Sequence, residues 1–147
     1  MTSAVPIEAN PSHYREGLAT FRPGGGFFRP DSRPSRDLGV LLSRSLARQG
    51  PPRVLDLMAG SGLRSLRYGL EGRAGEVWAN DADPDRLPLL QANLAPLAAR
   101  GCRVEATASS AQKLLAGCLL QERRFGLVDL DAFGCPTPLV GAAIEDR

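Results

Sequence analysis

Two acidic positions and a glycine turn form the strongest candidate site in the sequence. Asp56 lies within a short apolar run, Gly60 and Gly62 follow it, and Asp81 ends the next apolar run. Glycine lets backbone N–H groups at the start of a helix approach a ligand closely. An acid about 20 residues beyond such a turn is where a doubly wound fold binds a ribose. The pattern therefore predicts a site for a ligand that carries a ribose.

The elements that position these residues alternate along the chain. We expect strands at residues 54–57, 76–80, 102–106 and 125–131, and helices at residues 63–70, 84–100, 110–121 and from 138 onwards. Pro88 and Pro96 predict a late start or a kink in one of these helices, because proline lacks the N–H that a helix interior needs. Such alternation predicts an α/β protein with a partial parallel sheet of about four strands and helices on both faces. All candidate residues then lie at the carboxyl ends of strands, where open α/β sheets bind ligands.

The first part of the chain has a different character. Residues 1–35 hold many prolines and glycines and few periodic apolar positions. We expect an extended N-terminal arm with little regular structure there, followed by a domain at residues 36–147. A helix is predicted to begin near Ser35, and the leucines at positions 38, 41, 42 and 46 form its apolar stripe.

Composition narrows the class of protein. No apolar run approaches the roughly 18 residues of a membrane span, and the chain does not start with a basic segment and an apolar core, as a signal peptide does. The three cysteines lack CxxC spacing, which favours reduced thiols over a disulfide or a zinc site. We expect a cytoplasmic protein without a metal site.

Charge is distributed unevenly between the two halves. Residues 1–73 carry 11 basic and 6 acidic side chains, whereas residues 74–147 carry 7 and 10. A basic half suits a polyanionic partner such as a nucleic acid. Seventeen of the 18 basic residues are arginine, so a coding bias explains the asymmetry as well.

The spacing around the glycines separates two cofactor classes. A dinucleotide fingerprint needs GxGxxG or GxGxxA, whereas the run from Gly60 to Ser65 reads Gly-Ser-Gly-Leu-Arg-Ser. Asp56, four residues before Gly60, resembles the acid in the first motif of class I methyltransferases, which bind S-adenosylmethionine. A nicotinamide-dependent oxidoreductase stays as the alternative, because it shares the glycine turn and the acid for the ribose.

Four segments together resemble the tRNA guanine-26 N2-dimethyltransferase family. They are residues 27–38, 56–68, 80–84 and 129–136, and they occur in that family's order and at similar spacing. The resemblance covers roughly residues 16–145. It implies a Rossmann-like class I methyltransferase fold, S-adenosyl-L-methionine as methyl donor, and the exocyclic N2 of a guanine in tRNA as acceptor.

The resemblance also assigns the cofactor site. Arg36, Arg64 and Asp81 fall on cofactor-binding positions, and a planar guanidinium is well suited to a carboxylate or a phosphate. Asp56 would hold the methionine ammonium, and Asp81 the ribose hydroxyls. Ser110 and Ala111 stand where the family usually has aspartate and alanine to bind adenine, and a neutral hydroxyl binds more weakly than a carboxylate.

Asp131 and Phe133 fall on the catalytic positions of the same family. Asp131 would accept an N–H of the guanine amine and take its proton, and Phe133 would stack on a flipped guanine. The family has proline between these residues, whereas this chain has Ala132. Losing that proline frees the backbone of the turn that holds the amine.

A non-catalytic reading is also kept open. A truncated relative would at most bind cofactor or RNA, and the departures at Ser110 and Ala132 are compatible with that. A class I methyltransferase sheet has more strands than we expect here, so residues 125–131 would form an open edge. We therefore expect self-association, or complementation by a separate C-terminal polypeptide.

Overall fold

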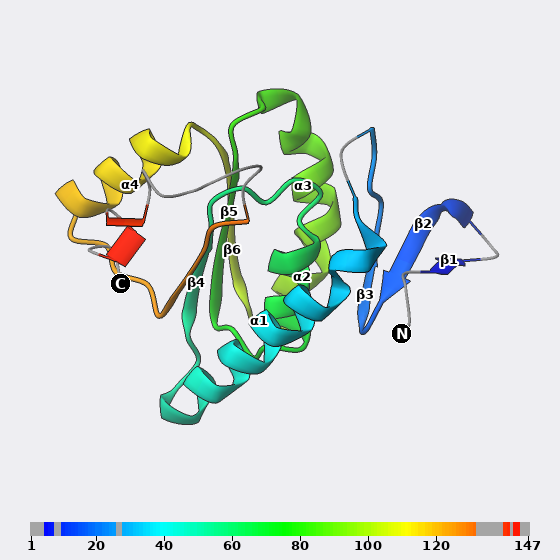
Figure 1. Ribbon diagram of the computed structural model, residues 1–147, viewed down its shortest axis with the longest axis horizontal. Coiled ribbons are helices and arrows are strands. Elements are labelled where there is room, and N and C mark those ends of the chain that lie inside the picture. The colour runs from blue at the N-terminus through cyan, green and yellow to red at the C-terminus, as the bar shows by residue number, and fades with distance from the viewer. Residues whose placement is uncertain (1–4, 8–9, 26–27, 132–139, 142, 145–147) are drawn as a thin grey trace.

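A parallel sheet forms the centre of the molecule. The computed structural model describes residues 5–7, 10–25, 28–131, 140, 141, 143 and 144. Within them a four-stranded parallel sheet has the order β6-β5-β4-β7 (Figure 1). Its strands are β4 (Arg53–Asp56), β5 (Glu76–Asp81), β6 (Arg103–Ala108) and β7 (Leu127–Asp129). The predicted parallel sheet is confirmed, and its last strand is shorter than expected.

Helices follow the strands in the predicted alternation. They are α1 (Arg33–Leu46), α2 (Leu63–Leu70), α3 (Leu87–Leu94) and α4 (Ala111–Leu120), with 3-10 segments η1 (Pro30–Ser32), η2 (Ala47–Gln49), η3 (Pro84–Arg86) and η4 (Ala95–Arg100). The segment after β5 becomes α-helical only at Leu87 and returns to 3-10 geometry at Ala95. Pro88 and Pro96 thus have the predicted effect. In the described part of the chain, no helix is long and apolar enough to cross a membrane.

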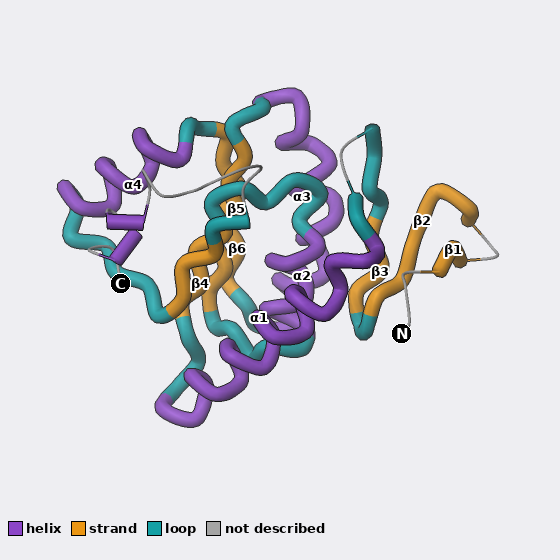
Figure 2. Tube along the Cα trace, in the orientation of Figure 1, coloured by secondary structure: helices purple, strands orange, loops and turns teal. Residues whose placement is uncertain are grey.

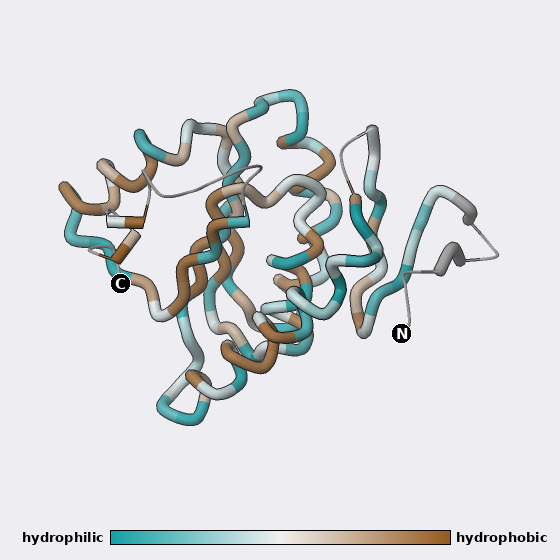
Figure 3. The backbone as a smooth tube through the Cα atoms, in the orientation of Figure 1, coloured by the Kyte–Doolittle hydropathy of each residue, from teal (hydrophilic) through white to brown (hydrophobic). Residues whose placement is uncertain are grey.

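Apolar side chains cover both faces of the sheet. Successive residues of a strand point to opposite faces, so Val54 and Val77 pack with α2 and α3, whereas Leu55 packs with α4. Figure 2 shows α4 on one side of the strands and α2 and α3 on the other. In Figure 3 the hydrophobic colour marks parts of the central strands and of the helices beside them. The helix layers therefore rest on two separate apolar clusters.

The prediction of little regular structure before residue 36 was wrong. Among the described residues, β1 (Val5–Ile7), β2 (Asn10–Glu16) and β3 (Ala19–Phe21) form an antiparallel sheet. Phe21 is fully buried, and its ring lies 5.0 Å from that of Phe28 in an edge-on arrangement. Phe21 also belongs to the same apolar cluster as Leu63 and Leu90. The N-terminal hairpin, β2 and β3, therefore depends on contacts between residues far apart in the sequence, which short apolar runs do not reveal.

The predicted buried face of α1 was also wrong. Leu38, Leu41 and Leu42 are 68, 60 and 50% exposed, and the helix instead buries Arg36, Val40 and Ser43. Ser43 donates a hydrogen bond of 2.8 Å to the carbonyl of Gly72 beyond α2. The face of α1 that carries Arg36 and Ser43 turns inward because both side chains have hydrogen-bond partners in the protein interior.

The strongest of these partners is the carboxylate of Glu16, which is fully buried. Arg36 binds it through two hydrogen bonds of 2.8 Å, and Arg67 of α2 adds a third of 3.1 Å. Arg67 also forms ion pairs with Glu71, at 2.8 Å, and with Asp37, at 2.7 Å. This cluster joins β2, α1 and α2, and it satisfies a charge that would be very costly to bury alone.

We expect Glu16→Gln to lower the free energy of unfolding by about 3–5 kcal/mol, because it leaves two buried arginines without their shared carboxylate. Urea unfolding measures this loss. Glu105→Gln is the matched control: its carboxylate is 44% exposed and pairs with Arg123, so we expect a loss of at most about 1 kcal/mol. Equal losses in the two variants would contradict the role given to Glu16.

Candidate active site

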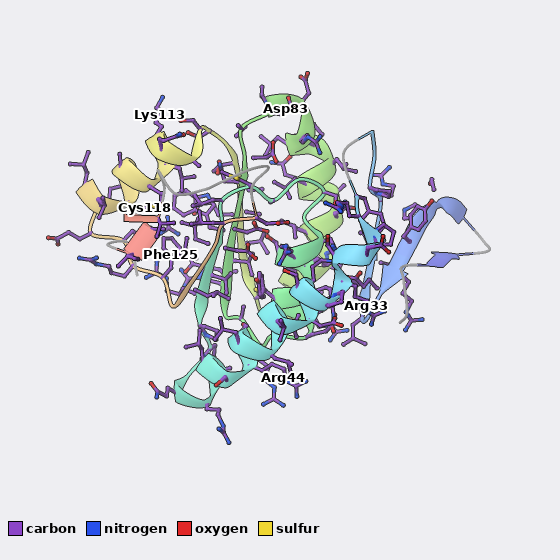
Figure 4. All side chains as sticks on the ribbon, in the orientation of Figure 1. Arg33, Arg44, Asp83, Lys113, Cys118 and Phe125 are labelled. Carbon is purple, nitrogen blue, oxygen red and sulfur yellow. The ribbon has the colours of Figure 1, made fainter. Side chains whose placement is uncertain are left out.

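The candidate residues gather where the strand order reverses. From β4 the chain moves to β5 and β6 on one side and then returns to β7 on the other. Ligands of open α/β sheets bind at such a point, beyond the carboxyl ends of the strands. Figure 4 places Asp83 and Lys113, which follow β5 and β6, at this end of the molecule, and Arg44 at the opposite end.

The glycine turn after β4 has two glycines with different tasks. Gly60 and Gly62 have φ values of 59° and 88°, a region that side chains disfavour. A Cβ on Gly62 would lie 2.7 Å from Leu90, so this glycine lets α2 and α3 pack closely. A Cβ on Gly60 would meet nothing closer than Arg86, at 4.0 Å. The backbone at Gly60 therefore borders open space that a ligand can use.

Asp81 closes this turn. One of its carboxylate oxygens accepts the N–H of Gly60 at 3.0 Å, and the other accepts the N–H of Asp83 at 3.0 Å. A carboxylate has further lone pairs, so it can accept additional bonds from ligand hydroxyls. The structure thus places two of the predicted cofactor residues in direct contact.

Asp56 is fully buried at the end of β4. Its Oδ2 accepts the hydroxyl of Ser65 at 2.7 Å, while its Oδ1 has no hydrogen-bond partner among the described residues. Burial, followed by the nearby Asp129 carboxylate, raises the pKa of Asp56 to about 8, against the smaller opposing effects of Ser65 and Arg64. An unpartnered buried oxygen of this kind fits a cationic or hydrogen-bonding ligand group.

Arg64, in the first turn of α2, connects both predicted halves of the site. Its Nε donates to Asp131 at 3.0 Å, Nη1 lies 3.6 Å from Asp129, and Nη2 donates to Ser35 at 3.1 Å. Burial lowers the pKa of Arg64, but the two carboxylates outweigh it, and the net shift is upward. A predicted cofactor residue and the predicted catalytic acid therefore form an ion pair.

Three other predicted cofactor residues have different surroundings. Arg36 is engaged with Glu16 and with the carbonyl of Arg29, at 3.0 Å. Ser110 caps α4 by accepting the N–H of Lys113 at 3.2 Å. Ala111 is buried in the apolar cluster under α4. Ligand contacts of these three residues stay predictions.

The loop after β7 is only partly described. Asp131 is the last residue of this stretch that the structure describes, and its side chain is 57% exposed. Phe133 and Ala132 lie outside the described residues. The predicted stacking role of Phe133 therefore stays a prediction.

Two buried asparagines support the site and were not predicted. Asn80 donates to the carbonyls of Leu57 and Ser109, at 3.1 and 2.8 Å, and so ties three strand ends together. Asn93 of α3 donates to the carbonyls of Ser61 and Arg22, at 2.7 and 2.8 Å. It thereby fixes the glycine turn to the end of β3. Nothing in the local sequence distinguishes either residue from a surface asparagine.

Comparison with known proteins decides the family. Residues 16–146 match the family model described as N2,N2-dimethylguanosine tRNA methyltransferase. The chain belongs to this family. The matched range contains β3, the glycine turn and β7, whereas β1 and all of β2 except Glu16 precede it.

Curated relatives named for this activity are similar in sequence. The tRNA (guanine(26)-N(2))-dimethyltransferase of Methanosphaerula palustris is 40% identical over 117 residues, which are 80% of this chain and 28% of the relative. That of Methanoregula boonei is 34% identical over 144 residues, covering 98% of this chain and 34% of the relative. The chain thus spans about a third of the length of the curated relatives that it matches.

A solved structure of the family has the same fold. The complex of Trm1 from Pyrococcus horikoshii with S-adenosyl-L-methionine superposes with a TM-score of 0.73 and 26% identity, over 90% of this chain and 38% of that one. TYW2 of M. jannaschii, solved with AdoMet, has a TM-score of 0.71 at 13% identity and shows the fold alone. The expected Rossmann-like methyltransferase fold is confirmed.

We expect the contribution of Asp56 to the stability of the folded chain to be lost between pH 3.8 and about 8, its ordinary and its folded pKa. A carboxyl whose pKa is higher in the folded chain favours folding below its unfolded pKa, and this contribution is lost as pH rises through the folded pKa. Asp56→Asn removes the titration, so its midpoint of thermal unfolding falls less over this range. Parallel pH profiles for the variant and the original chain would contradict the assignment.

Proposed function

We propose that this chain binds S-adenosyl-L-methionine at the carboxyl ends of β4 and β5 and serves the transfer of its methyl group to N2 of a guanine in tRNA. The observation that supports this most directly is the Asp81 carboxylate on the N–H of Gly60, within a chain of the dimethylguanosine family. The family assignment favours this methyl donor over a nicotinamide dinucleotide.

The residues around the turn fit the parts of that cofactor. Asp81 would accept hydrogen bonds from the ribose hydroxyls. The open space beside Gly60 would let the cofactor lie close to the backbone there. The unpartnered Oδ1 of Asp56 would receive the ammonium, directly or through water. Arg64 would bind the carboxylate, as guanidinium groups do well. Arg36, Ser110 and Ala111 complete the proposed contacts.

Asp131 is the proposed proton acceptor. The lone pair of a guanine amine is delocalised into the ring, so the amine is a poor nucleophile and gains from a base. Asp131 would accept one N–H and take the proton as nitrogen bonds to the methyl carbon and the carbon–sulfur bond breaks. The cofactor supplies the activated methyl group, and the protein aligns amine, methyl and sulfur. Phe133 would stack on the flipped base.

The RNA partner is supported by charge and exposure. Arg15, Arg22, Arg44 and Arg48 are exposed in the basic first half of the chain. Exposed arginines bind phosphates and give salt-dependent affinity for RNA. We place this activity in the cytoplasm.

Association with another polypeptide is part of the proposal. Among the described residues, β7 pairs with β4 on one side only. An unpaired edge of this kind accepts a further strand. We propose that a second copy of the chain or a separate C-terminal polypeptide supplies it.

We expect Asp81→Ala to weaken binding of S-adenosylhomocysteine by about 1.5–3 kcal/mol, the worth of a hydrogen bond to a charged group. Calorimetry measures the loss, and thermal unfolding confirms that the variant folds. Asp83→Ala is the matched control, because this neighbouring carboxylate is exposed and caps η3 instead. Unchanged affinity in Asp81→Ala would place the ribose elsewhere.

We expect the purified chain, with nothing added, not to methylate unmodified tRNA at an ordinary enzymatic rate. The reason is that β7 pairs with a strand on one side only, and the proposed base, Asp131, follows directly after this incompletely paired strand. Transfer of tritiated methyl groups measures activity, and size-exclusion chromatography measures association. A monomer that methylates tRNA efficiently would overturn the proposed need for a second polypeptide.

A further inference from the structure

Two carboxylates face α2 from neighbouring strands. Asp56 of β4 and Asp129 of β7 are paired in register, and each accepts a hydroxyl from the same helix. Ser65 donates to Asp56 at 2.7 Å, and Tyr68 donates to Asp129 at 2.6 Å. Asp56 belongs to the predicted cofactor site, whereas no role was predicted for Asp129 or Tyr68.

The hydroxyl of Tyr68 is held in place from both sides. Burial and the Asp129 carboxylate raise the pKa of Tyr68, so the hydroxyl stays protonated and donates. On the other side, a Cβ on Gly39 of α1 would lie 2.6 Å from the same oxygen. Helix α1 thus packs directly against the hydroxyl of Tyr68. The hydrogen bond from this hydroxyl in turn orients the carboxylate of Asp129.

Asp129 and Asp131 contact different nitrogens of the Arg64 guanidinium and differ in their exposure to solvent. The side chain of Asp129 is 9% exposed and lies 3.6 Å from Nη1 of Arg64. Asp131 is 57% exposed and binds Nε at 3.0 Å. An ion pair with an exposed partner contributes little net stability and exchanges readily, whereas a buried charge is weakly screened. We therefore expect the ion pair of Arg64 with Asp129 to persist when a ligand binds, and the ion pair with Asp131 to be the one that a ligand carboxylate replaces.

We propose that Asp129, oriented by Tyr68, is a positioning residue that keeps Arg64 in the cofactor site while Asp131 is released toward the acceptor amine. The proposal rests on the proposed function. Arg64 can then exchange the Asp131 carboxylate for that of the cofactor without leaving its place.

Asp129 also governs the protonation of its neighbour. The groups that face Asp56 are Ser65, Arg64 and Tyr68 from α2, and Asp129 and Asp131 from the β7 side. The charge of Asp129 raises the pKa of Asp56, after burial the largest cause. Binding of an ammonium group favours the charged form of Asp56, so cofactor binding near pH 7 releases a proton. Without the charge of Asp129, Asp56 is ionised more fully before binding, and less proton is released.

The test is calorimetry of S-adenosylhomocysteine binding near neutral pH, in two buffers of different ionisation enthalpy, which gives Kd and the protons released. Asp129→Asn is expected to raise Kd about tenfold, as loss of a charged partner does, and to reduce proton release clearly. Tyr68→Phe shifts Kd in the same direction by a smaller factor. Glu76→Gln is the control, since it removes a buried carboxylate at the opposite ends of the strands, and it leaves both quantities unchanged.

The outcomes separate this inference from the function on which it rests. If the original chain fails to bind S-adenosylhomocysteine, the proposed function fails. If it binds and Asp129→Asn keeps the same Kd, or weakens Kd with unchanged proton release, the positioning role is overturned. Where Asp129→Asn does not fold, Tyr68→Phe decides, and an unchanged Kd in that variant overturns the proposal.

Discussion

The buried charge of Glu16 is the constraint on which the N-terminal half of the structure depends. A carboxylate without solvent needs cationic partners, and Arg36 and Arg67 provide them from two different helices. Their geometry determines which face of α1 turns inward, and it holds the N-terminal hairpin against the sheet domain. Replacing such a cluster with apolar residues often costs nothing, but removing one member leaves charges unpaired. The three elements are therefore held in a single arrangement.

Helix α2 carries this constraint into the candidate site. Arg67 binds the Glu16 cluster, and Arg64, Ser65 and Tyr68 on the same short helix contact the carboxylates at the ends of β4 and β7. The position of the helix is fixed further by Gly62, where any side chain would meet Leu90. A shift of α2 would thus disturb the ion cluster and the site together.

The site itself brings three carboxyl groups close together, and two of them, Asp56 and Asp129, are buried. Arg64 forms ion pairs with Asp129 and Asp131. Burial raises the pKa of both Asp56 and Asp129. Perturbed carboxylates at a strand switch point are typical of functional sites. The excess of carboxylates suits a ligand that brings a positive group, as a sulfonium cofactor with an ammonium does. Family membership and this electrostatic pattern thus favour the same cofactor.

Local patterns in the sequence determined the alternation of strands and helices, the glycine turn and the acid that ends β5. These features are local, because a strand period, a proline or a glycine acts within a few residues. The four motif segments were sufficient to predict the family. Which stripe of α1 is buried, and the strands before residue 36, were decided by tertiary structure, since Glu16 and its two arginines are 20 and 51 residues apart in sequence. Likewise, only the fold brings Asp129 into register with Asp56 and Arg64 onto Asp131. Long-range electrostatic partners carry no periodic signal, and their energy depends on burial, which exists only once the chain has folded.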